Sequence, residues 1–370
     1  MIPLFKPSVS QKEIDAVTDV LKSGWWGLGT KTKEFEERFA AYVGTGYAVS
    51  LNSATAALHL SLNALNLPPR SEVITTPITF ISTAFAIHYN GLKPIFADIC
   101  PDTLNLNPED VYQKITPKTK VLLPVHFGGH ICDMDPLMAI ASEYGLSIVE
   151  DAAHAAGSSF NGKMAGTFGK FGCFSFHAVK NLATGDGGMI TTDDKEAYAR
   201  LNRLRWLGIN KSTSSRTASD HYSWDYDVEE IGYKCHGNDI LSSIGLAQLE
   251  RLEKLNDRRR KIFTKYNSSL RNVVEVPVWK KGVKSACHNY VVKAERRDEL
   301  ISHLGRLGIS AGVHYKPLYR HPFYHGLKAD CPVADRIWGK LVSLPIYPDM
   351  TEEESDSVID GVRSFYSSSP

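Results

Sequence analysis

The sequence predicts an α/β protein with a large domain, built on a mainly parallel seven-stranded sheet between helices, and a smaller C-terminal α/β domain. Seven short apolar runs alternate with helix-like segments between residues 47 and 192, which is typical of a sheet buried on both faces. The 370 residues exceed the length at which one hydrophobic core usually stops growing, which favours two domains. A second strand and helix pattern begins at His288 and supports the smaller domain.

The strands of the large domain are predicted from their apolar character and from the turn residues that bound them. In chain order they are YAVSLN, EVITT, PIFAD, KVLLPVH, SIVED, FGCFSF and GGMITT. Helices are expected to begin at Ala54 and after Phe80. Because ligands of α/β proteins bind beyond the strand ends, we expect the functional residues there.

The segment after the sheet is predicted to leave it and then form a long helix. Residues 211–227 are polar and rich in Ser and Thr, which indicates an exposed loop. Asp239 is expected to cap the long helix that follows. The basic run 258–261 on this helix is interpreted as a solvated helix face rather than as a nucleic-acid patch.

The C-terminal part is predicted to contain the strand NYVVKA, the helices RDELISHLGRLG and VADRIWGKLV, and a final helix after Thr351. We place the domain boundary at residue 245, so that residues 1–245 form the large domain and residues 246–370 form the small one.

Composition argues against several classes of partner and location. Lys and Arg total 42 and Asp and Glu total 41, so no overall field favours nucleic acid or an anionic membrane. The six cysteines are widely spaced without a C-x-x-C pair, which indicates a reducing cytoplasm. The sequence shows neither a signal-peptide pattern nor a run of about eighteen apolar residues, so we expect neither a cleaved signal nor a membrane span.

Lys180 and Asp151 are the first candidates for a catalytic site. Lys180 follows an apolar strand and precedes a glycine-rich turn, although a lone lysine there is more often an exposed loop residue. Asp151 ends the strand SIVED, where a buried charge is costly unless it is paired. A protonated pyridine nitrogen is such a partner, and a Schiff-base lysine plus an aspartate is the minimal pair for pyridoxal 5′-phosphate (PLP). A plain helix cap remains the alternative for Asp151.

Further residues fit the other parts of this cofactor. Ser53 and Thr55 open an apolar helix, and the first-turn N–H groups with these hydroxyls suit a phosphate; helix capping alone would also explain one of them. Ser175 adds a hydroxyl nearby. Phe80 can stack on a flat ring or belong to the core, and His154 can lie against the ring, with a structural core histidine as the alternative.

The ordered motifs NSATAALHL, EDAAHA, SFHAVKN with GDGG, and GYKCHGNDILSSIGLAQL resemble the DegT/StrS family of sugar aminotransferases, which has the type I PLP-dependent transferase fold. The resemblance extends from SGWWGLG (Ser23–Gly29) to LPIYPDMT (Leu344–Thr351). A related sugar 3-dehydratase has histidine at the position of Lys180, so the lysine here favours transamination.

The resemblance implies a role for each matching residue. It implies a Schiff base on Lys180, a pyridine contact from Asp151, phosphate contacts from Ala54, Thr55 and Ser175, and ring contacts from Phe80 and His154. In the family the position of Lys234 is often asparagine and reaches the phosphate of the neighbouring subunit, which implies a homodimer with two shared sites.

The expected reaction moves an amino group from an amino acid, L-glutamate by expectation, to a nucleotide-linked keto-sugar at C4 or C3, with pyridoxamine phosphate (PMP) as the intermediate. A cyclitol acceptor stays open. The alternatives are a PLP-dependent sugar dehydratase or lyase and a non-catalytic binding or regulatory homologue. The product would enter amino-sugar biosynthesis, for a polysaccharide or an antibiotic.

Contacts to the sugar are expected from residues in two loops, Trp25, Trp26, His314 and Tyr315, with ordinary loop structure as the alternative. Lys316 or Arg320 could meet a diphosphate. His126 and His130 have a metal-like spacing, but the two glycines between them argue against the helix that would align them, so no metal is expected.

Overall fold

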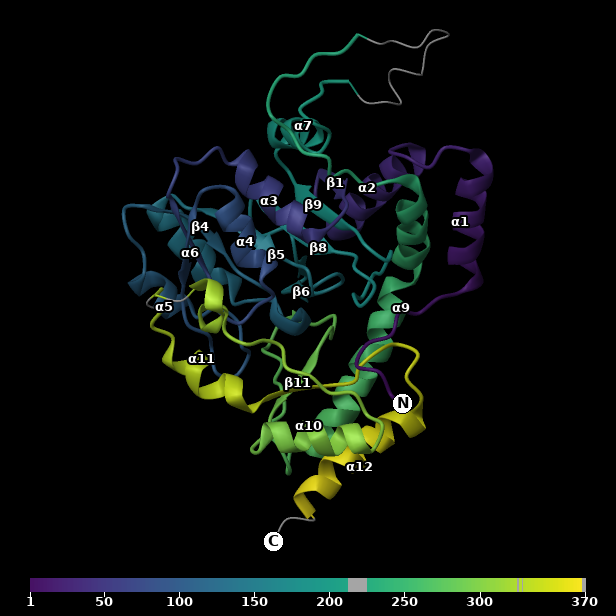
Figure 1. Ribbon diagram of the computed structural model, residues 1–370, viewed down its shortest axis with the longest axis vertical. Coiled ribbons are helices and arrows are strands. Elements are labelled where there is room, and N and C mark those ends of the chain that lie inside the picture. Colours follow the sequence, from purple (N-terminus) through teal and green to yellow (C-terminus); the bar gives the residue numbers. More distant parts are fainter. Residues whose placement is uncertain (212–224, 325, 328, 368–370) are drawn as a thin grey trace.

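The computed structural model of the protein describes residues 1–211, 225–324, 326–327 and 329–367 (Figure 1). Most of the loop predicted at 211–227 therefore lies outside the described residues. The large sheet contains all seven predicted strands, which confirms the α/β prediction. In spatial order they are β1 (Tyr47–Leu51), β9 (Gly188–Thr192), β8 (Phe171–Ser175), β5 (Ser147–Asp151), β4 (Thr119–Leu123), β2 (Glu72–Thr75) and β3 (Lys93–Phe96).

The sheet is parallel except around β9, which runs antiparallel to both β1 and β8. A parallel neighbour needs a crossover connection, usually a helix, and no helix separates β8 from β9. Successive residues face opposite layers: Val73 and Val121 belong to one buried cluster, whereas Ile74 and Leu122 belong to the other. Both faces are therefore buried, as the apolar strands predict.

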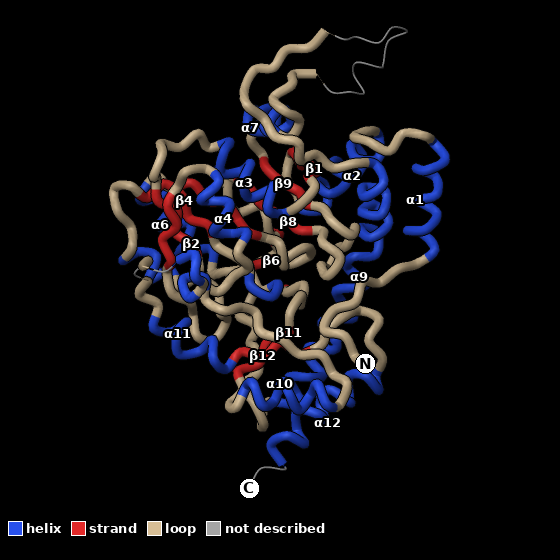
Figure 2. Tube along the Cα trace, viewed as in Figure 1, coloured by secondary structure: helices blue, strands red, loops and turns tan. Residues whose placement is uncertain are grey.

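Helices cover both faces of this sheet, as Figure 2 shows. Those inserted between its strands or following them are α3 (Ala54–Ala64), α4 (Ser82–Tyr89), α5 (Pro108–Gln113), α6 (Met134–Tyr144) and α7 (Lys195–Leu204). A small sheet joins β6 (Ser159–Phe160), β7 (Lys163–Met164) and β10 (Val283–Lys284), and short 3₁₀ turns lie at Phe127–Gly129, Leu318–Arg320, Pro322–Tyr324 and Trp338–Lys340.

The long helix α9 (Asp239–Leu270) connects the two halves of the molecule (Figure 1). The N-terminal helices α1 (Gln11–Ser23) and α2 (Thr30–Val43) pack against it. The expectation that Asp239 caps α9 is wrong, because Asn238 is the N-cap and its Oδ1 accepts from the Leu241 N–H at 2.9 Å. The Asp239 carboxylate instead faces the start of α2.

The C-terminal part is built around β11 (Tyr290–Lys293) and β12 (Leu341–Leu344), which pair antiparallel. Its helices are α10 (Arg297–Arg306), α11 (Pro332–Ile337) and α12 (Glu352–Ser367). The predicted helix VADRIWGKLV is therefore wrong at its end, where buried pairing with β11 overrides the helical pattern. Residue 245 lies within α9, so this helix crosses the proposed boundary between the domains.

The basic run on α9 is only partly the solvated face that was expected: Arg258 and Lys261 are exposed, whereas Arg259 and Arg260 are not. Arg259 is only 4% exposed and its guanidinium lies inside the protein. Arg260 Nη1 donates to the Ser285 carbonyl oxygen at 3.1 Å and its Nη2 donates to Asp257 at 2.6 Å. The prediction therefore fails for Arg259 and Arg260, because their side of α9 packs against the rest of the chain instead of facing water.

All six cysteines are free thiols. None of the helices that the structure describes is long and apolar enough to cross a membrane.

Candidate active site

A cavity of about 350 Å³ lies where several strands of the large sheet end, and the C-terminal part of the chain closes one side of it. Most residues predicted for the site line this cavity, although they are spread over more than 260 positions of sequence. They are Ser53, Ala54, Thr55, Phe80, Asp151, His154, Ser175, Lys180, His314 and Tyr315.

Lys180 follows β8 and lines the cavity. Burial disfavours the charged ammonium and lowers the pKa of Lys180 to about 8, while the negative charge of Asp151 opposes this shift. A substantial fraction of the amine is therefore uncharged at mildly basic pH, and only the uncharged nitrogen can attack a carbonyl group.

Asp151 ends β5 and is 4% exposed. Its Oδ2 accepts from the Thr83 hydroxyl at 2.7 Å, and its Oδ1 accepts from the Ala153 N–H at 3.1 Å. Burial raises the pKa of Asp151, and these two hydrogen bonds oppose that shift. Because both donors are neutral, the buried carboxylate can still gain a cationic partner, as a protonated pyridine ring would be.

The start of α3 forms a further wall of the cavity. Ser53 is the N-cap, and its hydroxyl accepts from the Ala56 N–H at 3.1 Å. The Thr55 hydroxyl lies 2.8 Å from that of Ser82. A side chain at Gly188 would overlap the backbone of Ser53, so the glycine lets β9 approach this turn closely. Hydroxyls and first-turn N–H groups gathered in this way suit a phosphate.

His154 lies in an irregular turn after β5. The Gly128 N–H donates to its Nδ1 at 3.3 Å, so Nε2 carries the proton and donates to the Tyr315 hydroxyl at 3.2 Å. Burial lowers the pKa of His154 well below its usual value, and Lys180 lowers it further. The imidazole is therefore neutral and its tautomer is fixed.

His314 and Phe80 also line the cavity. His314 Nδ1 lies 2.7 Å from the Ser343 hydroxyl, and burial lowers the pKa of His314 to about 4. Phe80 is 59% exposed, and its ring lies 6.3 Å from that of Tyr315, centroid to centroid. Phe80 therefore belongs to the open side of the cavity rather than to the core.

Three predicted site residues do not line this cavity within one chain. The indole N–H groups of Trp25 and Trp26 donate to backbone carbonyl oxygens of their own segment, and both rings are exposed. Lys234 is exposed, and its ammonium lies 3.3 Å from the centroid of the Trp206 ring. Of the two basic residues considered for a diphosphate, Arg320 binds Asp335 at 2.6 Å.

The histidines with metal-like spacing have other partners. His126 Nε2 lies 2.9 Å from Glu150, and His130 Nδ1 lies 2.8 Å from the Ile131 carbonyl oxygen. Both residues are buried and contribute to local structure.

Sequence reasoning missed two residues that act on the predicted pair. Thr83 binds Asp151, and His288 Nε2 lies 3.4 Å from the Lys180 amine. Thr83 lies on α4 and His288 precedes β11, so only the packing of distant segments brings them here. A Thr in an apolar helix is an unspecific signal, and His288 belongs to no motif identified in the sequence.

The fold and this set of residues define a PLP-dependent enzyme of the type I fold. Residues 7–363 match the DegT/DnrJ/EryC1/StrS aminotransferase family, and the chain belongs to this family. It is thus a PLP-dependent sugar aminotransferase.

Similar proteins cover the whole chain. The spore coat polysaccharide biosynthesis protein SpsC of Bacillus subtilis (strain 168) is 41% identical over 98% of this chain and 96% of its own length. Spr1654 from Streptococcus pneumoniae, solved in a PMP-form, is 34% identical with a TM-score of 0.93 and 98% of each chain covered, and it was also solved in a PLP-form. Helicobacter pylori PseC, an aminotransferase involved in the biosynthesis of pseudoaminic acid, is 27% identical with a TM-score of 0.93 and 100% of each chain covered.

Proposed function

We propose that the protein transfers an amino group from L-glutamate to a nucleotide-linked keto-sugar at C4 or C3, in amino-sugar biosynthesis. The observation that carries this proposal is one cavity holding a lysine amine with a pKa of about 8 and a buried aspartate bound only by neutral donors. The names of SpsC and PseC, which refer to polysaccharide and to pseudoaminic acid biosynthesis, support an amino-sugar product.

In this proposal each residue of the cavity has a separate role in binding the cofactor or in moving a proton. When bound, the cofactor supplies an electron sink for the charge left when a proton leaves carbon. Lys180 Nζ holds the cofactor covalently and, once released, moves the proton as general base and acid. The Asp151 carboxylate keeps the pyridine nitrogen protonated, while Phe80 and His154 flank the ring. The phosphate contacts are Ser53, Ala54, Thr55 and Ser175.

The substrate and subunit contacts complete the proposal. His314 and Tyr315 contact the sugar from the cavity wall, and Trp25 and Trp26 contact it from a loop. Lys234 reaches the phosphate in the neighbouring subunit of a homodimer, which agrees with its position outside the cavity of its own chain. We also propose the division into residues 1–245 and 246–370, and a cytoplasmic location, which six free thiols support.

The absorption spectrum of the purified enzyme tests the central assignment. We expect visible colour in the wild type and in Lys261→Ala, a control on the exposed face of α9, but not in Lys180→Ala. Glutamate should shift the spectrum and yield 2-oxoglutarate. Unchanged colour in Lys180→Ala would contradict the role of Lys180. Colour without 2-oxoglutarate would favour another donor or the lyase reaction.

The acceptor is best identified in the reverse direction. A panel of nucleotide-linked amino-sugars that differ at C3 and C4 is incubated with 2-oxoglutarate, and the formation of glutamate is followed. We expect turnover with one ring position only. An amino-cyclitol that reacts faster than every nucleotide-linked sugar would contradict the proposed acceptor.

A further inference from the structure

His288 contacts the lysine of the site from the C-terminal part of the chain. It precedes β11, is 3% exposed, and its Nε2 lies 3.4 Å from Lys180 Nζ. The Phe5 ring stacks on the imidazole at 5.4 Å between centroids with planes 9° apart, and His154 lies at 4.4 Å on an inclined plane. These contacts hold the imidazole plane in one orientation.

A chain of buried amides determines which nitrogen of His288 carries the proton. Asn181 Nδ2 donates to the Ala286 carbonyl oxygen and to Asn256 Oδ1, each at 2.7 Å. A backbone carbonyl oxygen can only accept, so the Asn181 nitrogen is assigned and its Oδ1 remains as an acceptor. That oxygen lies 3.1 Å from His288 Nδ1, which must therefore be the donor.

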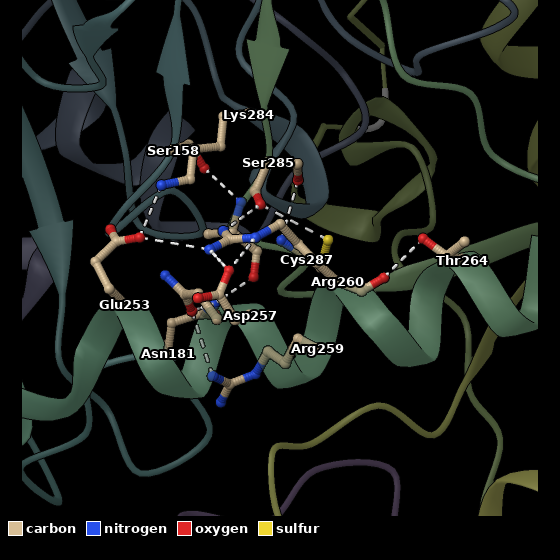
Figure 3. Close-up of polar contacts among 12 residues, drawn as sticks. Ser158, Asn181, Glu253, Asp257, Arg259, Arg260, Thr264, Lys284, Ser285 and Cys287 are labelled. Carbon is tan, nitrogen blue, oxygen red and sulfur yellow. Dashed lines mark hydrogen bonds and ion pairs between the residues drawn. The ribbon is translucent and has the colours of Figure 1, made fainter.

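The orientation of the Asn256 amide, at the other end of this row of hydrogen bonds, is determined in the same way. Asn256 Nδ2 donates to the Ala156 carbonyl oxygen at 3.0 Å, which leaves Asn256 Oδ1 to accept from Asn181 and from Arg259 Nη1 at 3.4 Å. Figure 3 shows Asn181 beside α9 and Arg259 extending from that helix. The buried guanidinium can only donate. Neither asparagine amide can therefore turn over without losing a hydrogen bond.

The remaining nitrogen of His288 is thus a lone-pair acceptor that faces Lys180. Burial lowers the pKa of His288 well below its usual value, and the charged or titratable groups that face it, Lys180, His154, Arg259 and His314, lower it further. The imidazole therefore stays neutral near pH 7, and Nε2 keeps its lone pair.

We propose that His288 is a positioning residue for Lys180: its Nε2 accepts a hydrogen bond from the lysine amine whenever that amine is free of the cofactor, and so holds the amine in one orientation for proton transfer. This inference rests on the role of Lys180 given under the proposed function. The network through Asn181, Asn256 and Arg259 keeps His288 in the tautomer that can accept.

Two matched substitutions separate this role from simple packing. The amide of glutamine can place an acceptor at the position of Nε2, whereas the amide of asparagine reaches only the position of Nδ1. We expect His288→Gln to behave like the wild type. His288→Asn should slow the single-turnover half-reaction with glutamate by about tenfold or more, because a displacement of a reacting group by about 1 Å can cost roughly a hundredfold in rate.

The amine itself provides a readout without cofactor. In the cofactor-free protein, the pH dependence of covalent labelling at Lys180 measures its pKa. His288→Asn should lower that pKa below the value of the wild type and of His288→Gln, because the ammonium loses an acceptor. An unchanged pKa together with equal half-reaction rates in both variants would overturn the proposal.

The tautomer can be tested in the unmutated protein, which covers the case of a variant that does not fold. Nitrogen-15 NMR of histidine-labelled wild-type protein, with the ring of His288 assigned through its own backbone amide, should show an imidazole that is protonated at Nδ1 and bare at Nε2. Protonation of His288 at Nε2 would overturn the inference. Borohydride reduction and peptide mapping distinguish a failure of the proposed function from a failure of the role of His288. Cofactor attached to a residue other than Lys180 contradicts the proposed function. Cofactor attached to Lys180, together with wild-type rates in His288→Asn, contradicts only the role of His288.

Discussion

At the residue scale, the Lys180 amine is a destabilising group in the cofactor-free protein. Its folded pKa of about 8 lies below the ordinary value of 10.5, so the unfolded chain takes up a proton first as the pH falls. The folded protein therefore pays no penalty above pH 10.5, loses stability as the pH falls toward about 8, and carries the full penalty below that pH. We expect Lys180→Met to be more stable than the wild type at pH 7 by up to about 3 kcal/mol.

Urea denaturation of the cofactor-free proteins at pH 7 and pH 10.5 measures this difference, with Lys261→Met as the exposed control. The advantage of Lys180→Met should shrink toward the higher pH. A difference that is independent of pH would show that the Lys180 amine does not titrate as the cavity predicts.

Thr83 is expected to support the charge on Asp151. Thr83→Val removes the hydroxyl that donates to Oδ2, which raises the pKa of Asp151 further and weakens its hold on a cationic ring. We expect kcat/KM to fall by about tenfold or more, the effect of losing one hydrogen bond to a charged group. Thr83→Ser keeps the donor and should retain most activity; an equal loss in both variants would assign the effect to packing instead.

At the element scale, Asp239 joins the starts of α2 and α9. Its carboxylate accepts from the backbone N–H groups of Gly29, Lys31 and Thr32 at 3.0, 3.2 and 2.8 Å, and from the Thr32 hydroxyl at 2.7 Å. Asp239→Ala leaves these donors unpaired and should lower the free energy of unfolding by about 2–3 kcal/mol. Urea denaturation tests this, with the exposed Asp360→Ala on α12 as control. A change no larger than that of the control would contradict the assignment.

The elements of the large sheet could be predicted because each strand carries an apolar run that only a two-sided buried sheet accommodates. The end of VADRIWGKLV could not, since residues 341–344 pair with β11, whose position relative to them is a tertiary property. Arg259 shows the same limit: its helix was predicted, but the packing of α9 between two halves of the chain determines that its side chain is buried.

At the scale of the whole molecule, the proposed shared site predicts complementation between two inactive variants. Lys180→Ala lacks the amine, and Lys234→Ala lacks the phosphate contact offered to its neighbour. A mixed dimer would contain one complete site, so an equal mixture should recover roughly a quarter of the wild-type activity if subunits exchange at random. Steady-state kinetics after refolding the mixture together measure this. Failure to recover, with mixed dimers present, would place Lys234 outside the partner's site.

The sequence by itself determined the α/β class, the seven strands and the lysine–aspartate pair, because these depend on local apolar patterns and on a few residue types at strand ends. The ordered motifs in the sequence also indicated the family. The tertiary structure decided which distant side chains complete the pair. Thr83 and His288 reach Asp151 and Lys180 only because α4 and the segment before β11 pack against the strand ends. It also decided that Arg259 is buried and that the His288 tautomer is fixed, since hydrogen-bond directions depend on which backbone carbonyls lie nearby in space rather than in sequence.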